Sequence, residues 1–371
     1  MRFSTLFLFL FVSCIFLLAC GQKSFKPADS QLVTQDGFPS AMTDTLAKYL
    51  ATMPNGTQVA CVRITDSLPY FYGVLRESDQ LKTTANPAAI FEIGSISKVM
   101  TATLLARAVQ RGTVELDEPI DPYLPYTLKG ELPITFQQLA NHTSGLPRVP
   151  GDMAQDIIFN RNNPYKDYDT SRLRKFLSEK LELEQDPGED FAYSNLGAGL
   201  LGQTLAYITG KSYEQQLQEI IFQPYGMEQS TTDRTKVDAA LVQGLNANGK
   251  PTANWDLPAL AGAGAVLSSA DDLASFVLAH FNPQDSLLSR TREMTYQRGE
   301  MGGVGLGWFI RREGERSLYW HNGGTGGYKA FLMMDPISQD AVIVLSNCSA
   351  FSDQSPKIDA LGQALLPPLN N

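Results

Sequence analysis

The stretch Ser95-Ile96-Ser97-Lys98 could activate a serine, because it opens a mostly apolar segment that predicts a helix over 96–111. Residues three apart on a helix are neighbours, so the Ser95 hydroxyl and the Lys98 amine would face one spot. The free N–H groups of a helix start can stabilise an oxyanion, and burial lowers the pKa of a lysine towards that of a useful base. Alternatively, Ser95 caps the helix and Lys98 reaches solvent.

A second candidate group is Tyr193-Ser194-Asn195, which precedes a predicted helix over 196–209. A tyrosine beside a lysine can relay protons because the cation stabilises its phenolate, and an asparagine offers a donor and an acceptor to an amide-like substrate. Alternatively, Tyr193 packs in the core and Asn195 caps the helix.

A third candidate group, Trp320-His321-Asn322-Gly323-Gly324, closes a predicted strand over 317–321. A hydrogen-bonding side chain followed by glycines would let a substrate lie along the strand edge, with the Gly324 N–H as a second oxyanion donor. Alternatively, this is a glycine-rich hairpin with an incidental histidine. On the first interpretation of these two groups, Asn195, His321, Asn322 and Gly323 would bind the substrate.

The elements that must position these motifs alternate in type along the chain. Strand patterns occupy 57–65 and 69–76 near the N-terminus and 307–312, 317–321, 328–334 and 341–348 near the C-terminus. Short helical segments and loops fill about 136–260. We therefore expect an α/β protein of the α+β type. Its antiparallel sheet would be built from N- and C-terminal strands and flanked by helices, with an inserted, mainly helical subdomain.

Composition narrows the range of functions. The 371 residues include 39 acidic and 30 basic side chains, and the net charge of −9 argues against a nucleic-acid partner. The three histidines are far apart in sequence, so we expect no metal site. The glycine pattern at 197–202 follows no buried strand, so we expect close helix packing there and no cofactor.

The N-terminus resembles an export signal, with Arg2 followed by an apolar run that ends Leu17-Leu18-Ala19-Cys20. This ending is similar to a bacterial lipobox, which predicts a signal peptide over 1–19, lipidation of Cys20 and a tether over 20–38. The protein would then be lipid-anchored in the bacterial cell envelope, facing the periplasm or exterior. An ordinary secretory peptide and an uncleaved anchor are the alternatives.

Two cysteines remain after the leader, Cys61 and Cys348, each in or at the end of a strand-like run. Export would permit a disulfide between them if the two strands are neighbours. Two buried thiols are the alternative.

The order and spacing of the three motifs closely resemble the β-lactamase and penicillin-binding-protein superfamily. The similar branch holds class C β-lactamases, serine D-Ala-D-Ala carboxypeptidases and β-lactamase-like esterases. The loop 141–147 (Asn-His-Thr-Ser-Gly-Leu-Pro) and the glycine-rich segment 261–273 resemble the same branch. The resemblance covers about 40–366, within a hydrolase domain expected at 39–371.

The resemblance implies Ser95 as acyl-enzyme nucleophile, Lys98 as its activating partner and Tyr193 as general base and acid. The Ser95 and Gly324 N–H groups would form the oxyanion hole. His321 stands where β-lactamases have lysine, so selection for an anionic substrate should weaken.

Expected substrates are β-lactams, D-amino-acid peptides or small esters, with efficient penicillin hydrolysis least expected. The rival interpretation is a non-catalytic envelope lipoprotein that binds penicillin or wall peptides.

Overall fold

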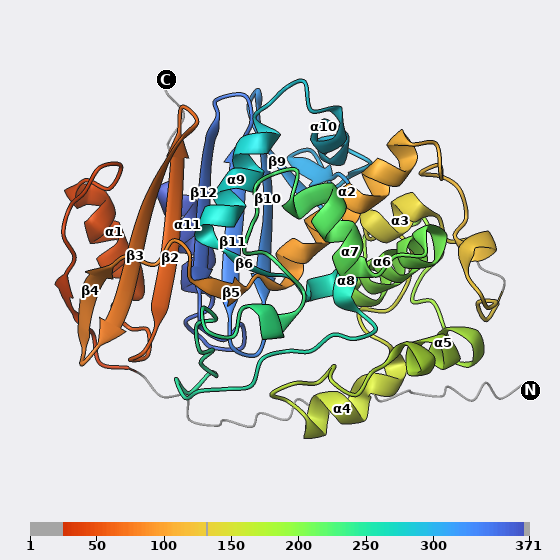
Figure 1. Cartoon of the computed structure of the whole chain (residues 1–371), viewed down its shortest axis with the longest axis horizontal. Helices are drawn as coiled ribbons and strands as arrows, with labels where there is room; N and C mark the ends of the chain where they lie inside the picture. The colour runs from red at the N-terminus through yellow and green to blue at the C-terminus, as the bar shows by residue number, and fades with distance from the viewer. Residues whose placement is uncertain (1–24, 131–132, 367–371) are drawn as a thin grey trace, which may run out of the picture.

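The computed structural model describes residues 25–130 and 133–366, so the predicted signal peptide and Cys20 lie outside the described residues. Ten strands form one sheet and two more form a small ribbon (Figure 1). The strands are β1 (Asp29–Gln31), β2 (Gln58–Thr65), β3 (Leu68–Glu77), β4 (Gln80–Thr84), β5 (Ile90–Glu92), β6 (Leu267–Ser269), β7 (Tyr296–Gln297), β8 (Gly302–Val304), β9 (Phe309–Glu313), β10 (Arg316–Gly324), β11 (Lys329–Asp335) and β12 (Asp340–Ser346).

The large sheet joins the two ends of the chain, in the order β1-β4-β3-β2-β12-β11-β10-β9-β8-β7. The N-terminal β2 pairs antiparallel with the C-terminal β12, with Cys61 opposite Val344. Every residue of β11 is buried, which is expected of a central strand covered on both faces. The β1–β4 pair is parallel and the other pairs of this sheet are antiparallel, which confirms the expected fold class.

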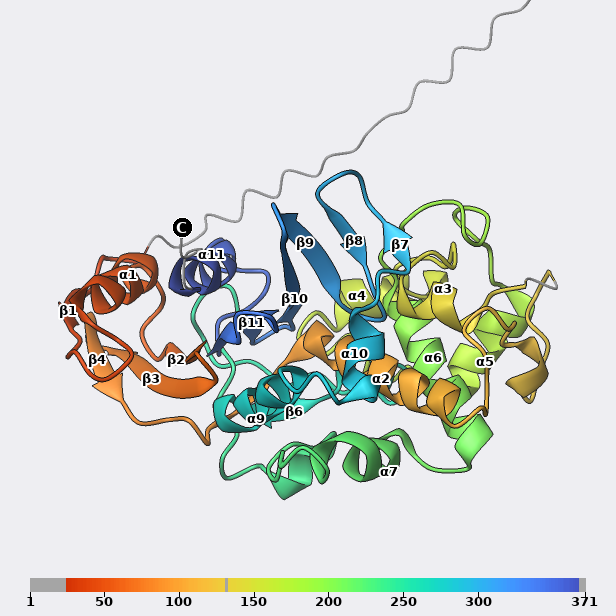
Figure 2. The ribbon, with the colours of Figure 1, turned by 90° about the horizontal axis from the view of Figure 1, so that it is seen from above.

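Helices cover both faces of the sheet, and more helices fill the segment between β5 and β6 (Figures 1 and 2). The helices are α1 (Ser40–Leu50), α2 (Ser97–Gln110), α3 (Phe136–Ala140), α4 (Ala154–Phe159), α5 (Thr170–Glu179), α6 (Asn195–Thr209), α7 (Tyr213–Leu217), α8 (Ala261–Gly264), α9 (Ala270–His280), α10 (Ser286–Arg292) and α11 (Pro356–Leu365). The helices α3 to α7 form the inserted, mainly helical part.

Two apolar layers hold these elements together. On one face α1 and α11 bury residues such as Leu46 and Leu361 against β2, β11 and β12. On the other face α2 and α9 pack with the helical part into a larger core. The helix α2 lies inside this core, with Ser97 to Ala106 all buried. Its first turn is therefore fixed from every side.

The glycine-rich start of α6 packs against α8. An added methyl group on Gly202 would lie 3.2 Å from the Gly262 Cα atom, and one on Gly262 would lie 2.6 Å from the Ala198 carbonyl oxygen. Only glycine permits such backbone approach, so the expectation of close packing is confirmed.

The fold begins earlier than the expected boundary at residue 39. Asp29–Gln31 forms β1 on β4, and Phe38 is fully buried. The predicted tether over 20–38 is therefore wrong in its second half, because backbone pairing holds residues 29–31 to the sheet edge. Within the described ranges we find no helix that is both long and apolar enough to cross a bilayer.

Cys61 and Cys348 are both free, buried thiols. Their strands are neighbours as expected, but the partner of Cys61 is Val344, four residues before Cys348. Four residues of extended chain span on the order of 13 Å, whereas a disulfide needs Cα atoms about 4.4–6.8 Å apart. The offset along the strands accounts for two separate thiols.

Candidate active site

Ser95 lies in a single 3-10 turn, Gly94–Ile96, which leads directly into α2 at Ser97. The predicted helix start at residue 96 is thus one residue early. Because the turn and the helix are continuous, Ser95 and Lys98 still face one spot. Ser95 is partly exposed, whereas its neighbours on both sides are buried. The hydroxyl group is the part of this turn that solvent and a substrate can reach.

Lys98 is buried and makes three short contacts through its Nζ atom. The amine lies 3.0 Å from Ser95 Oγ, 2.8 Å from Asn195 Oδ1 and 2.7 Å from the Ala263 carbonyl oxygen. Burial, helped by the nearby Arg148 charge, lowers the pKa of Lys98 well below its usual 10.5. The alternative in which Lys98 reaches solvent is therefore wrong.

Tyr193 lies beside this pair, with its ring centroid 4.9 Å from Lys98 Nζ. Burial raises the pKa of the phenol, although a side-chain interaction with Ser95 and the Arg148 charge both act to lower it. The phenol therefore holds its proton while it faces the nucleophile. The three residues predicted to be catalytic meet at one point.

Ser194, and not Asn195, caps α6. Its hydroxyl accepts a 2.8 Å hydrogen bond from Gly197 N and donates one of 2.7 Å to the Pro147 carbonyl oxygen. This cap leaves the Asn195 side chain free to face Lys98 and Tyr165, whose hydroxyl lies 3.4 Å from Asn195 Nδ2. The predicted role of Asn195 beside the substrate is compatible with this placement.

His321 lies on β10 with its ring 6.4 Å from that of Tyr193. Its Nδ1 lies 2.6 Å from the Asn322 carbonyl oxygen, which can only accept, so Nδ1 carries the proton. Burial, aided by the Lys98 charge, lowers the pKa of His321 to about 3. The ring is neutral and presents its Nε2 lone pair as an acceptor.

The edge of β10 beyond Trp320 is open towards Ser95, because β9 pairs only with Arg316–Trp320. The glycines here lie against the nucleophile turn. A methyl group on Gly323 would lie 3.1 Å from Ser95 N, and one on Gly94 would lie 2.6 Å from Gly324 N. The backbones that carry the Ser95 and Gly324 N–H groups therefore lie in contact, which brings the two predicted oxyanion donors close together.

Asn322 points away from this site, which corrects its predicted role in substrate binding. Successive side chains of a strand alternate between faces, and its neighbours His321 and Gly323 occupy the cleft side. The Asn322 amide donates a 3.1 Å hydrogen bond to Asp359 on α11. The same carboxylate pairs with Lys329 at 2.8 Å.

The motif reasoning missed four contributors to the site. The His142 ring lies 4.4 Å from that of Tyr193, and its Nδ1 accepts from Ser194 N at 3.2 Å. The Arg148 guanidinium lies 5.0 Å from the Tyr193 ring centroid, and Phe309 stacks on that ring at 6.4 Å. The fourth is the Ala263 carbonyl. The only signals for them in the sequence were the family resemblance of the loop 141–147, which holds His142, and that of the segment 261–273, which holds Ala263.

Comparisons with known proteins give related matches along most of the chain. The family model "Beta-lactamase" matches residues 46–365. The chain is 29% identical to D-alanyl-D-alanine-carboxypeptidase/endopeptidase AmpH of Escherichia coli (strain K12), over 90% of this chain and 91% of that one. It is 27% identical to Protein flp of Staphylococcus aureus (strain MW2), over 75% of this chain and 56% of that protein.

Solved structures agree in fold. A beta-lactamase/D-alanine carboxypeptidase from Pseudomonas syringae superposes with a TM-score of 0.73 at 20% identity, covering 88% of this chain and 98% of that one. The corresponding protein from Yersinia pestis, solved with citrate, gives a TM-score of 0.71 at 23% identity with the same coverage.

Proposed function

The chain belongs to the beta-lactamase family, and from that premise we propose an exported hydrolase that cleaves an amide or ester through an acyl-Ser95 intermediate. Serine-hydrolase chemistry of this kind is common to the family.

The arrangement around Lys98 Nζ carries the proposal. Two of its three partners, the Asn195 amide oxygen and the Ala263 carbonyl oxygen, can only accept hydrogen bonds. A neutral amine has two N–H donors and one lone pair. With both donors used, the lone pair faces the Ser95 hydroxyl at 3.0 Å, which is the geometry of a general base.

The reaction then follows in two balanced halves. The Ser95 oxygen bonds to the substrate carbonyl carbon as its proton passes to Lys98, and the oxyanion is held by the Ser95 and Gly324 N–H groups. The carbon–nitrogen or carbon–oxygen bond breaks, and Tyr193 gives its proton to the leaving group and is reprotonated from Lys98. Water then hydrolyses the acyl ester, restoring Ser95 and releasing an acid.

For the substrate class we propose D-amino-acid peptides ahead of β-lactams. The AmpH relative, whose name states D-alanyl-D-alanine carboxypeptidase and endopeptidase activity, aligns over nine tenths of this chain. The neutral His321 offers only an acceptor at Nε2, so it would take a hydrogen bond from an N–H or O–H group of the substrate and would not pair with a carboxylate. Small esters could be cleaved by the same acyl transfer to Ser95.

The deciding experiment compares wild type with Ser95→Ala on a D-alanyl-D-alanine peptide, nitrocefin and a short-chain p-nitrophenyl ester. Turnover that disappears in Ser95→Ala supports the hydrolase. Ser97→Ala is the matched control, because the Ser97 hydroxyl lies in the same motif but accepts a 3.1 Å hydrogen bond from Val266 N. A stable fluorescent-penicillin adduct, seen as a mass increase without turnover, would instead identify a binding protein.

Export and anchoring are part of the proposal and rest on the sequence before residue 25. Cys20→Ser should move the protein from the membrane fraction to the supernatant and remove labelling by radioactive palmitate. Membrane association unchanged in this variant would overturn the lipid anchor and leave the hydrolase proposal intact.

A further inference from the structure

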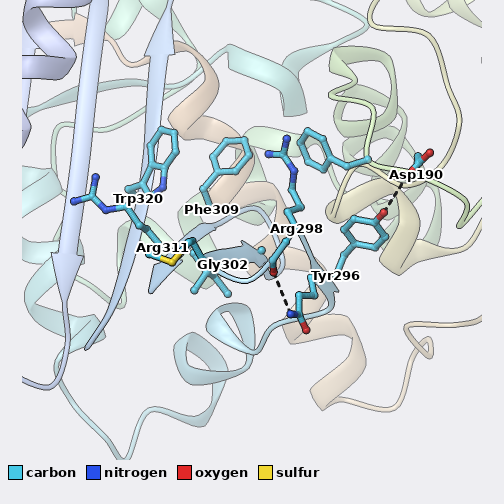
Figure 3. A pocket seen from close by; sticks show the side chains of 13 residues that line it. Asp190, Tyr296, Arg298, Gly302, Phe309, Arg311 and Trp320 are labelled. Carbon is cyan, nitrogen blue, oxygen red and sulfur yellow. Dashed lines mark hydrogen bonds between the residues drawn. The ribbon is translucent and has the colours of Figure 1, made fainter. Parts of the chain in front are cut away.

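A cavity of about 640 Å³ lies beside the proposed catalytic centre, between the β7–β8–β9 edge of the sheet and the segment that leads to Tyr193 (Figure 3). Phe309 stands between Trp320 and Arg298, and Asp190 lies beyond Arg298 at the far end from Trp320 (Figure 3). The catalytic chemistry described above uses none of these charged groups.

The cavity shares a wall with the catalytic centre. Phe309 lines the cavity, and its ring also lies 6.4 Å from the Tyr193 ring and 5.1 Å from that of His321. A group that passes the Phe309 ring therefore moves from the catalytic cleft into the cavity without crossing a strand.

The open edge of β10 sets the direction in which a substrate runs. The carbonyl carbon of a bound substrate would lie at the Gly324 end of this edge, next to the proposed oxyanion hole. The proton donor Tyr193 lies towards His321 and Phe309, so the leaving group must extend to that end. Because β9 occupies the same edge of β10 up to Trp320, its first residue, Phe309, stands where an extended leaving group arrives.

One cation in the cavity is available to a ligand. The Arg298 guanidinium lies 3.8 Å from the Phe191 ring centroid and forms no ion pair within the described chain. Arg311 is already paired with Glu313 at 2.8 Å. Asp190 accepts a 3.4 Å hydrogen bond from Tyr296 at the end far from Trp320, so an anion is favoured on the Phe309 side of Arg298.

We propose that this cavity is a subsite for the leaving group, which accepts an apolar arm over Phe309 and Trp320 and binds a distal carboxylate through Arg298. The inference rests on the proposed function, because it takes Tyr193 as the proton donor. It makes the protein selective for peptides whose released part is longer than a single D-alanine. A guanidinium group that lies against an aromatic surface attracts a carboxylate by charge and also fixes its position through directed hydrogen bonds, so it can select for such a leaving group.

The test uses three peptides with the same diacetyl-L-lysyl-D-alanyl acyl part. Their leaving groups are D-alanine, D-2-aminopimelate and the ω-amide of D-2-aminopimelate. Wild type should cleave the carboxylate form about tenfold better in kcat/KM than the amide form, the ratio expected from one charged hydrogen-bonded pair. Arg298→Gln should bring the ratio close to one, and Arg298→Lys should keep part of it.

Arg312→Gln is the matched control. Arg312 lies on β9 and does not line the cavity, so this variant loses one positive charge without changing the proposed subsite. Its carboxylate-to-amide ratio should equal that of wild type, and thermal unfolding verifies that each variant is folded. D-alanine release with a wild-type ratio near one, or a ratio that Arg298→Gln leaves intact, overturns the subsite alone. Absence of cleavage of all three peptides overturns both the subsite and the proposed peptide substrates, whereas ester turnover that Ser95→Ala abolishes would still support the hydrolase.

Discussion

Glu92 offers a sharp test of the electrostatics beneath the active site, because its carboxyl is buried three residues before the nucleophile. Its Oε1 accepts hydrogen bonds from Asn254 Nδ2 at 2.8 Å and Trp255 N at 2.9 Å. Burial raises the pKa of Glu92 from 4.5 to about 7, against the opposing effect of the Thr325, Asn254 and Trp255 contacts. The folded protein therefore prefers this side chain in its neutral form.

The magnitude follows from linkage between protonation and folding. A carboxyl whose pKa is higher in the folded state binds more protons there, so its contribution to stability falls as pH rises from about 4.5 to 7. The rise of the Glu92 pKa from 4.5 to about 7 corresponds to about 3 kcal/mol of stability, which is fully lost above pH 7. Glutamine in Glu92→Gln keeps the accepting oxygen, does not titrate, and can donate to the Thr325 hydroxyl.

We therefore expect Glu92→Gln to match wild type near pH 4.5 and to exceed its free energy of unfolding by about 3 kcal/mol at pH 8. Urea unfolding of both proteins between these pH values measures the difference, in which the titration of all other groups cancels. Glu228→Gln, at an exposed position, is the control. A difference that stays flat with pH, or favours wild type at pH 8, refutes the reasoning.

Other predictions follow from the same structure. Lys98→Met should lower kcat/KM by about 10² to 10⁴-fold in steady-state assays, and wild-type activity should rise with pH well below 10.5. His280, fully buried with its pKa well below 6.5, is neutral when folded and charged when unfolded in acid. Stability should therefore fall by about 1.4 kcal/mol per pH unit below about pH 6, a slope that His280→Phe removes in urea unfolding. Asn322→Ala should change kcat/KM less than about twofold and cost about 1 kcal/mol of stability, because its amide bonds only α11. A thiol titration of the denatured, unreduced chain from residue 25 should count both Cys61 and Cys348; neither reacting would contradict the offset of their strands.

The sequence was informative wherever chemistry is local. The Ser95–Lys98 spacing, the Tyr193–Asn195 group and the glycines at 323–324 were each read from a few adjacent residues, and they meet in the structure. Alternation along β10 was also available in the sequence. It would have placed Asn322 on the opposite face from His321, and applying it there would have avoided that error.

Contacts between residues far apart in the sequence could not be predicted from the spacing of neighbouring residues. Arg148, Phe309 and the Ala263 carbonyl reach Tyr193 or Lys98 from separate loops and strands, and no spacing rule connects them. The early start of the fold at β1 was missed because three polar residues on a sheet edge lack the apolar alternation that predicts a strand.

The amino-acid sequence by itself determined the kinds of reactive group, the family resemblance, and the assembly of one sheet from both ends of the chain. Only the tertiary structure decided the protonation of those groups, because the pKa values of Lys98, His321 and Glu92 depend on burial and on charges far away in sequence. It also decided where a leaving group can go, since the cavity beside Phe309 exists only where the sheet edge meets the segment before Tyr193.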